Sequence, residues 1–230
     1  MSTYLDFLTP KRNTCLSTEE LDRIIYRLIL ASMESEATCQ CSIGALQIMN
    51  ELRSVQTFVE LETIFSLFER IHSQGQAMLK CKECRASPKS TLMTLPALAD
   101  QSLALFEAAC LAYNISRKDA LFDPSLTQFL CIRSKIQLGQ MELDDDETVV
   151  LVRMLLGKNS RRLLELLKAL RSIIKDCGQS HRSGVSTLRA CENSVEQSIH
   201  CMAMFIEQVE AESGKHVVLI FAYCVVDRGE

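Results

Sequence analysis

The chain has 230 residues and a formal net charge of −4, so it favours one domain and excludes a general electrostatic attraction to nucleic acid or anionic membranes. Apolar residues make up 47% of the sequence, which excludes a wholly disordered chain. Glycine and proline are scarce, at eight and four residues, so the composition favours helices over sheets. We therefore expect an all-α fold, an irregular bundle of about six helices.

The cysteine count and the apolar runs indicate the compartment. The N-terminal segment lacks the basic start and apolar centre of a signal peptide. Eleven cysteines, an odd number, are then expected to be reduced thiols. The longest apolar stretch, Leu92–Tyr113, is interrupted by Asp100 and Glu107, so we expect no membrane-spanning helix.

The first elements in chain order are two helices. Residues 1–16 read as an irregular lead-in. Ser17 and Glu20 form a capping box, in which the two side chains accept hydrogen bonds from backbone amides that have no partner within the helix. The helix that follows should run to about Met33. A short second helix is expected over Ala45–Val55.

Thr57 and Glu60 form a second capping box. The helix behind it should end between Gly75 and Cys81 and bury one apolar face, made of Leu61, Ile64, Phe65, Phe68 and Ile71.

A loop containing Pro88 should come next. Leu95–Tyr113 is apolar nearly all round and predicts a central, buried helix. Pro96 should lie in the first turn of this helix, where its missing N–H costs nothing.

Residues 114–141 are expected to be the longest irregular connection. Four acids, Asp144 to Glu147, then suit the N-terminal end of the longest helix, which should run to about Lys175 with a bend at Gly157. Its second half separates an apolar stripe from a basic face; the stripe is Leu163, Leu166, Leu167, Leu170, Ile173 and Ile174, and the basic residues are Lys158, Arg161, Arg162, Lys168 and Lys175.

A loop over Gly178–Gly184 precedes the last helix, which should stop at Gly214. Its apolar face is the most regular in the chain: Leu188, Cys191, Val195, Ile199, Met202, Ile206 and Val209. The helical domain is thus expected over residues 17–213. In the tail, 214–230, the apolar run Val217–Val226 fits a strand, a cap on the helical core or an exposed segment.

The cysteines and histidines offer weak metal-site candidates. Cys81-Lys-Glu-Cys84 is the only C-x-x-C, and a structural zinc site needs four ligands. No second C-x-x-C follows, Cys39 and Cys41 are a weaker pair, and a thioredoxin-like setting is missing. None of the four histidines, His72, His181, His200 and His216, stands four residues from another, and His200 lies opposite the apolar stripe. We therefore predict no metal ligands, no cofactor and no catalytic residues.

Two charged segments have a structural and a functional interpretation. The acids of Asp144–Glu147 could bind magnesium, but a second acidic cluster from another helix is missing, which favours a helix start. The segment from Thr148 to Lys175 contains seven Lys and Arg residues and one acid, Glu165, so its net charge is +6. Such a face could meet phosphates or an acidic partner, and a solvated face is the commoner outcome. No aromatic residues interleave with it, which argues against a stacking platform for single strands.

Three segments, in this order, carry a resemblance to a known family. The first is a helix from Phe58-Val-Glu-Leu-Glu-Thr-Ile-Phe into the loop Cys81-Lys-Glu-Cys84, and the second is the apolar helix within Leu92–Tyr113. The third runs from Lys135-Ile-Gln-Leu-Gly through the acidic turn to the leucine-rich long helix. Together these segments resemble the C-terminal regulatory region of fungal binuclear zinc-cluster transcription factors of the aflatoxin regulatory protein type, over roughly residues 40–176.

The resemblance implies a nuclear regulator of secondary-metabolite gene clusters that acts through protein partners, such as a coactivator or a DNA-binding subunit. The family's DNA-binding module has six cysteines with two C-x-x-C pairs, and no segment here matches it. Direct DNA binding is therefore not implied, and neither is a membrane. Two alternatives stay open: a helical scaffold unrelated to transcription, in the cytoplasm, and a helical enzyme of unrecognised type.

Overall fold

The structure is a computed structural model that describes residues 39–55, 57–86, 89–115, 128–180 and 185–211. The expected lead-in, the helix from Ser17, the stop at Gly214 and the tail at 214–230 lie outside these residues, as do Pro88, His181 and His216.

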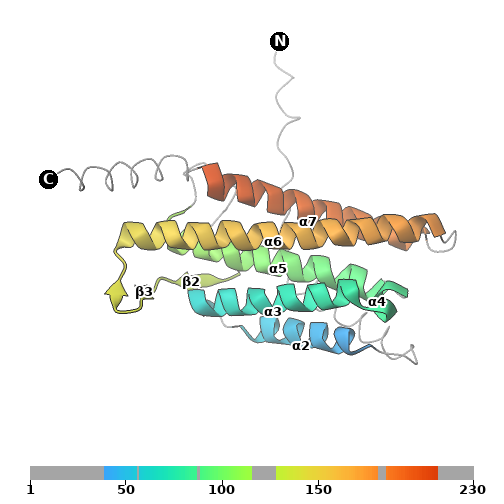
Figure 1. Ribbon diagram of the computed structural model, residues 1–230, viewed down its shortest axis with the longest axis horizontal. Coiled ribbons are helices and arrows are strands. Elements are labelled where there is room, and N and C mark those ends of the chain that lie inside the picture. Colours follow the sequence, from blue (N-terminus) through green and yellow to red (C-terminus); the bar gives the residue numbers. More distant parts are fainter. Residues whose placement is uncertain (1–38, 56, 87–88, 116–127, 181–184, 212–230) are drawn as a thin grey trace, which may run out of the picture.

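The described residues form an all-α bundle, as the composition predicts. Its six described helices are α2 (Gln40–Ser54), α3 (Leu61–Lys80), α4 (Lys82–Ala86), α5 (Lys89–Ala112), α6 (Asp145–Ser180) and α7 (Val185–Ala211). The two longest, α6 and α7, run side by side, and α2 and α3 lie along the opposite side of the bundle (Figure 1). One apolar core extends through all six helices.

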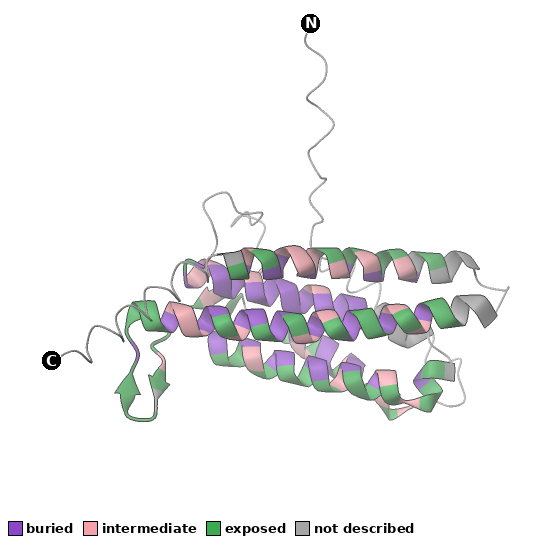
Figure 2. Cartoon of the chain, turned by 45° about the horizontal axis from the view of Figure 1, so that its top comes forward, coloured by how far each residue is buried: buried purple, intermediate pink, exposed green. Residues whose placement is uncertain are grey.

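Helix α5 is the centre of the bundle, as its all-round apolar sequence predicts. Nearly all of its described side chains are buried, whereas the outer helices bury one side (Figure 2). Phe106 has no exposed surface and stacks between Phe68 of α3 and Phe205 of α7, with ring centroids 5.4 and 6.2 Å away. One aromatic row therefore joins three helices.

The start of α5 corrects the prediction. The helix begins at Lys89, so Pro96 lies inside it and not in its first turn. A proline there removes one helical hydrogen bond, and the burial of the surrounding residues, from Leu95 to Ala99, outweighs that loss. At the other end Asn114 adopts a left-handed φ of 53°. The amides of Asn114 and Ile115 donate to Leu111 and Cys110, which is a Schellman stop.

The acidic start of α6 is a reciprocal capping box. The Glu147 amide donates to Asp144 Oδ1 at 2.7 Å, and the Asp144 amide donates to Glu147 Oε2 at 3.0 Å. These carboxylates therefore satisfy the helix end, as the structural interpretation predicts. The helix continues through Gly157 without a break, so the expected bend does not interrupt it, and it extends to Ser180.

The apolar stripes of the two long helices are confirmed in large part. Leu163, Leu166, Leu167, Leu170 and Ile174 are buried on α6, and Cys191, Val195, Met202, Ile206 and Val209 are buried on α7. Ile173 and Ile199 are half-buried, and His200 is exposed as expected. The 3.6-residue period of the apolar residues therefore predicts the buried face of both helices.

Extended segments correct two further predictions. Thr57 does not cap α3: residues Phe58–Glu60 form strand β1, and the Leu130 amide donates to the Thr57 carbonyl at 2.7 Å. β1 pairs in parallel with β2 (Leu130–Ile132), and β3 (Gln137–Leu138) pairs antiparallel with β4 (Met141–Glu142). The connection over 114–141 is therefore not wholly irregular.

One stretch of the described chain, Thr94–Ala112, is long and apolar enough to cross a membrane by composition. Within the bundle 78% of that window is buried. A core helix of a globular bundle has this composition too, which is the role α5 has here.

Candidate metal centre

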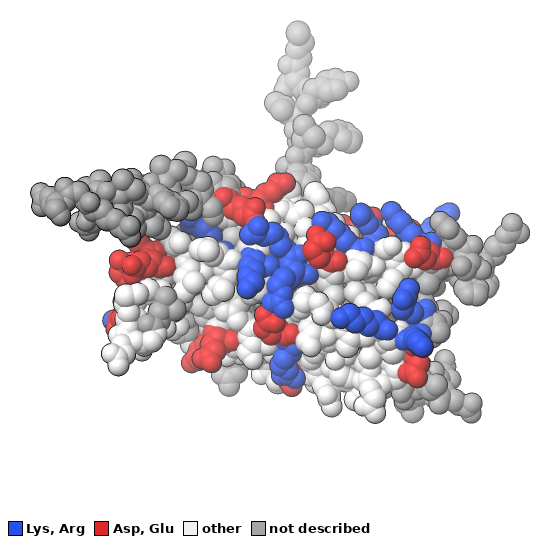
Figure 3. All heavy atoms as spheres, viewed as in Figure 1, with Lys and Arg blue, Asp and Glu red and all other residues white. Residues whose placement is uncertain are grey.

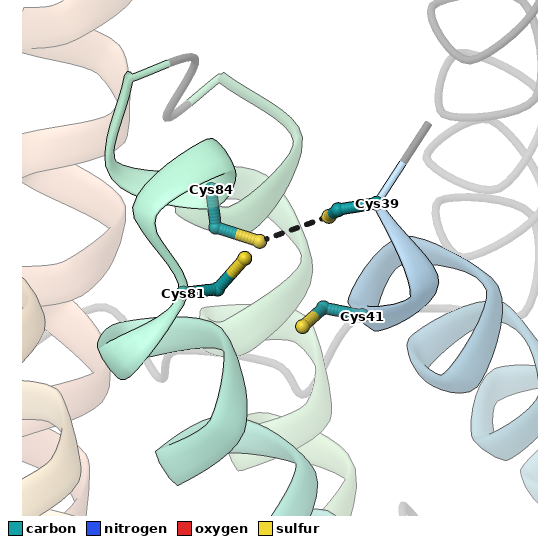
Figure 4. Close-up of side chains that lie close together, drawn as sticks. All are labelled: Cys39, Cys41, Cys81 and Cys84. Carbon is teal, nitrogen blue, oxygen red and sulfur yellow. Dashed lines mark hydrogen bonds between the residues drawn. The ribbon is translucent and has the colours of Figure 1, made fainter. Parts of the chain in front are cut away.

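Four cysteines from two distant segments meet at one end of the bundle. Cys39 is the N-cap residue of α2 and Cys41 lies in its first turn, whereas Cys81 caps the end of α3 and Cys84 lies in α4. The four Sγ atoms all lie within 4.8 Å of one another. Figure 4 shows the four side chains turned toward a common centre. We call these residues the four-cysteine cluster.

Local structure explains the convergence. α2 and α3 form a helical pair joined through β1, so the start of α2 comes beside the end of α3. The side-chain amide of Gln74 on α3 donates to the Cys41 carbonyl at 2.7 Å. Gly44 leaves room for this amide, because a Cβ at that position would lie 2.6 Å from Gln74 Oε1 and displace the glutamine side chain.

The thiols interact directly. The Sγ atoms of Cys39 and Cys84 are 3.2 Å apart, and Cys39 Sγ lies 3.6 Å from Ser42 Oγ. Burial raises the pKa of the Cys39 thiol, but the hydrogen bonds of Cys84 and Ser42 outweigh burial and lower the pKa to about 7. Burial, followed by the interaction with Cys81, raises the pKa of the Cys41 thiol.

The cluster has the donor set of a structural zinc site. Four thiolates arranged around one point are the ligands of closed, tetrahedral zinc centres. Cys84 is buried and the other three are half-buried, so the cluster is enclosed and still reachable by an ion from solvent. The remaining described cysteines, Cys110, Cys131, Cys191 and Cys201, lie elsewhere in the fold.

In the sequence alone these residues form two separate weak pairs, for which we predict no metal. The C-x-x-C of Cys81 and Cys84 lacked a second pair of matching spacing, and the partner is the C-x-C of Cys39 and Cys41. One signal was available: a cysteine pair immediately before one helix and another immediately after the next. An antiparallel helix pair places those two positions at the same end.

The other polar candidate is the contact between α3 and α6. Arg162 forms an ion pair with Glu69, donates to His72 Nδ1 at 3.1 Å and lies over the Phe68 ring. Burial, then the positive charge of Arg162, lowers the pKa of His72. The histidine is therefore held as a neutral packing residue, and its contribution to stability is lost as the pH falls below its unfolded value of about 6.5.

The basic face of α6 is mostly neutralised by neighbouring acids. Figure 3 shows Lys and Arg gathered along α6 with acidic side chains interspersed. Seven Lys and Arg lie between Thr148 and Lys175, and one of them, Arg153, is buried. Four others form ion pairs with acids: Arg161–Glu210, Arg162–Glu69, Lys168–Glu165 and Arg171–Glu196. This pairing disfavours a phosphate-binding face and supports the solvated interpretation.

Comparison of the chain with protein-family models, with curated proteins and with solved structures found no match.

Proposed function

We propose that this chain is a helical regulatory domain that alters transcription through contacts with other proteins, as the resemblance to fungal zinc-cluster factors implies. The three segments of that resemblance correspond to consecutive parts of the bundle. A helix runs into a cysteine-bearing turn (α3 and α4), a buried helix follows (α5), and a glycine turn at Gly139 leads to the long helix α6. This order supports the proposal.

The observation that carries a role in protein contacts is an exposed apolar patch on the β1–β2 pair. Phe58, Leu130 and Ile132 are 62%, 46% and 46% exposed. Phe58 is directly opposite Leu130, and Ile132 is two residues further along the same strand, so the three side chains share one face. Val59, between them on the other face, is 3% exposed and belongs to the core. We call the three exposed residues the sheet patch.

The sheet patch suits a protein partner better than the outer faces of the long helices do. The outer faces of α6 and α7 are the other candidate surface for a partner. Among the described residues, those faces expose one large apolar side chain, Met154, and carry the ion pairs Arg161–Glu210 and Arg171–Glu196. Single exposed apolar residues are ordinary, whereas clustered ones mark interaction surfaces. The partner we expect is therefore a coactivator or DNA-binding subunit that contributes an apolar surface.

The test fuses the chain to a foreign DNA-binding domain upstream of a reporter gene in a fungal nucleus. We expect transcription to change several-fold, up or down, relative to the foreign domain alone. Replacing the sheet patch with threonine (Phe58→Thr, Leu130→Thr, Ile132→Thr) should return the reporter to baseline, because threonine preserves strand propensity and removes the apolar contact. The matched control is Met154→Gln on α6, which should keep the effect.

Two results would count against this function. One is an unchanged reporter with the intact chain present at normal abundance by immunoblot. The other is an equal loss of effect in the Met154→Gln control. An unchanged reporter together with purely cytosolic recovery of the chain would favour the alternative, a helical scaffold unrelated to transcription.

A further inference from the structure

We propose that the four-cysteine cluster binds one structural zinc ion that joins the start of α2 to the end of α3. The inference goes beyond the regulatory function and does not depend on it. Its ligands are also distinct from the six-cysteine DNA-binding module of the zinc-cluster factors, because they come from the helical bundle as one C-x-C and one C-x-x-C pair.

The sulfur positions fit a single tetrahedral ion. With zinc–sulfur bonds of about 2.3 Å, neighbouring sulfurs in a tetrahedron are separated by about 3.8 Å. The observed Sγ atoms lie within 4.8 Å of one another, and those of Cys39 and Cys84 are 3.2 Å apart. Side-chain rotations that shift the sulfur atoms by a few tenths of an ångström to about one ångström reach the tetrahedral spacing. An iron–sulfur cluster inserts bridging sulfides between its cysteines and spreads them further apart, so a mononuclear site fits better.

The charged residues beside the four-cysteine cluster suit its zinc-bound state. Binding converts four thiols to thiolates and releases four protons to solvent, with no change in oxidation state, so one Zn²⁺ gives a centre of net charge −2. Lys80, Lys82 and Arg85 stand beside the two ligands of the α3–α4 turn, opposed by Glu83 alone in that segment. All four charged side chains are exposed. The local excess of two positive charges therefore offsets the charge of the loaded site.

The position of the cluster gives the ion a structural task. α2 has 15 residues, a length at which an isolated helix is marginal, and buries only Ala45, Ile48, Met49 and Leu52. The exposed ion pair of Arg70 with Glu51 lies toward the end of α2 that is joined to α3. The four-cysteine cluster lies at the open end of the same helix pair. A zinc ion there would close the pair at the end that the chain itself leaves open.

The first experiment measures metal in the full chain purified under reducing conditions. After incubation with zinc chloride and removal of unbound ion by gel filtration, elemental analysis should give one zinc per chain. Four thiols should be protected from a thiol-alkylating reagent, and a zinc chelator should expose them. Mass spectrometry of the alkylated peptides should place those four thiols at the cluster positions.

Variants assign the ligands. Cys39→Ser and Cys41→Ser remove half-buried ligands at the start of α2, so a correctly folded protein is expected, checked by its helical circular dichroism. Each should weaken zinc binding by more than about 100-fold, since losing a mere supporting hydrogen bond already costs 10–100-fold. The matched control is Cys131→Ser, a half-buried cysteine on β2, which should still bind one zinc with unchanged affinity.

Three results would overturn the proposal. The first is a reduced, folded chain that retains no zinc after gel filtration. The second is zinc retained to the same level in Cys39→Ser, Cys41→Ser and Cys131→Ser, which would place the ion elsewhere. The third is a pair of disulfides within the cluster in protein kept under cellular reducing conditions, which would assign the four sulfurs to covalent cross-links.

Discussion

Phe106→Ala should lower the free energy of unfolding by about 3–5 kcal/mol, the range for removing a buried phenylalanine from a packed core. Phe106 has no exposed surface, and its ring contacts the rings of Phe68 and Phe205. The substitution therefore leaves a cavity where three helices meet, and none of the three can move inward without separating from the others. Urea unfolding followed by circular dichroism measures the change.

The control for this variant is Met154→Ala on the outside of α6. Met154 is 64% exposed, so its truncation should change the free energy of unfolding by no more than about 0.5 kcal/mol. If Phe106→Ala cost no more than Met154→Ala, then α5 would not be the centre of the bundle and the helix arrangement would be wrong.

The free energy of unfolding should also fall as the pH rises from about 4 to about 7, because two carboxyl groups of α5 lose their protons in this range. Burial raises the pKa of Asp100 to about 6, although the Ser198 hydroxyl, which donates to its Oδ1 at 2.8 Å, opposes that shift. Burial raises the pKa of Glu107 to about 7. In both cases the folded state holds the proton more tightly than the unfolded state does. The associated stability is therefore fully present below the unfolded pKa and lost as the pH rises through the folded pKa.

Asp100→Asn isolates the contribution of Asp100 in a side chain of the same shape. Asparagine keeps an acceptor for Ser198 and cannot ionise, so the variant should be more stable than the original chain at pH 8. The expected gain is about 1–3 kcal/mol, because one pKa unit corresponds to about 1.4 kcal/mol. At pH 4 the two proteins should be nearly equal. Glu62→Gln on the exposed side of α3 controls for the loss of one charge.

The pH profile must be read as a difference between proteins, because His72 acts in the opposite direction. Its lowered pKa removes stability as the pH falls below about 6.5. Subtracting the profile of Asp100→Asn from that of the original chain cancels this contribution. A difference that does not vary between pH 4 and pH 8 would mean that Asp100 is solvated in the folded chain.

The helices were predictable from the sequence where one face is apolar over several turns. α6 and α7 show this most clearly, because their stripes repeat long enough for the helical period to exclude a strand. α5 was predictable for a different reason: a run that is apolar on all sides has to lie inside the bundle. The start of α5 was not predictable, because Pro96 suggested that the helix begins at Leu95, and tertiary packing overrides that local signal.

The strands and the four-cysteine cluster were not predictable by the same reasoning, since both depend on partners far away in the chain. β1 has three residues, and its extended form comes from pairing with β2 across 72 positions, from Phe58 to Leu130. The capping-box pattern of Thr57 and Glu60 is a local signal, and the pairing outweighs it. Cys39 and Cys84 are 45 residues apart, and only the antiparallel course of α2 and α3 brings them together.

X-ray absorption at the zinc edge, on the reduced and zinc-loaded chain, tests most directly whether two distant segments share one ion. We expect four sulfur neighbours at about 2.3 Å and no nitrogen or oxygen in the inner sphere. A spectrum dominated by nitrogen or oxygen ligands, or one with only two sulfurs, would contradict this expectation.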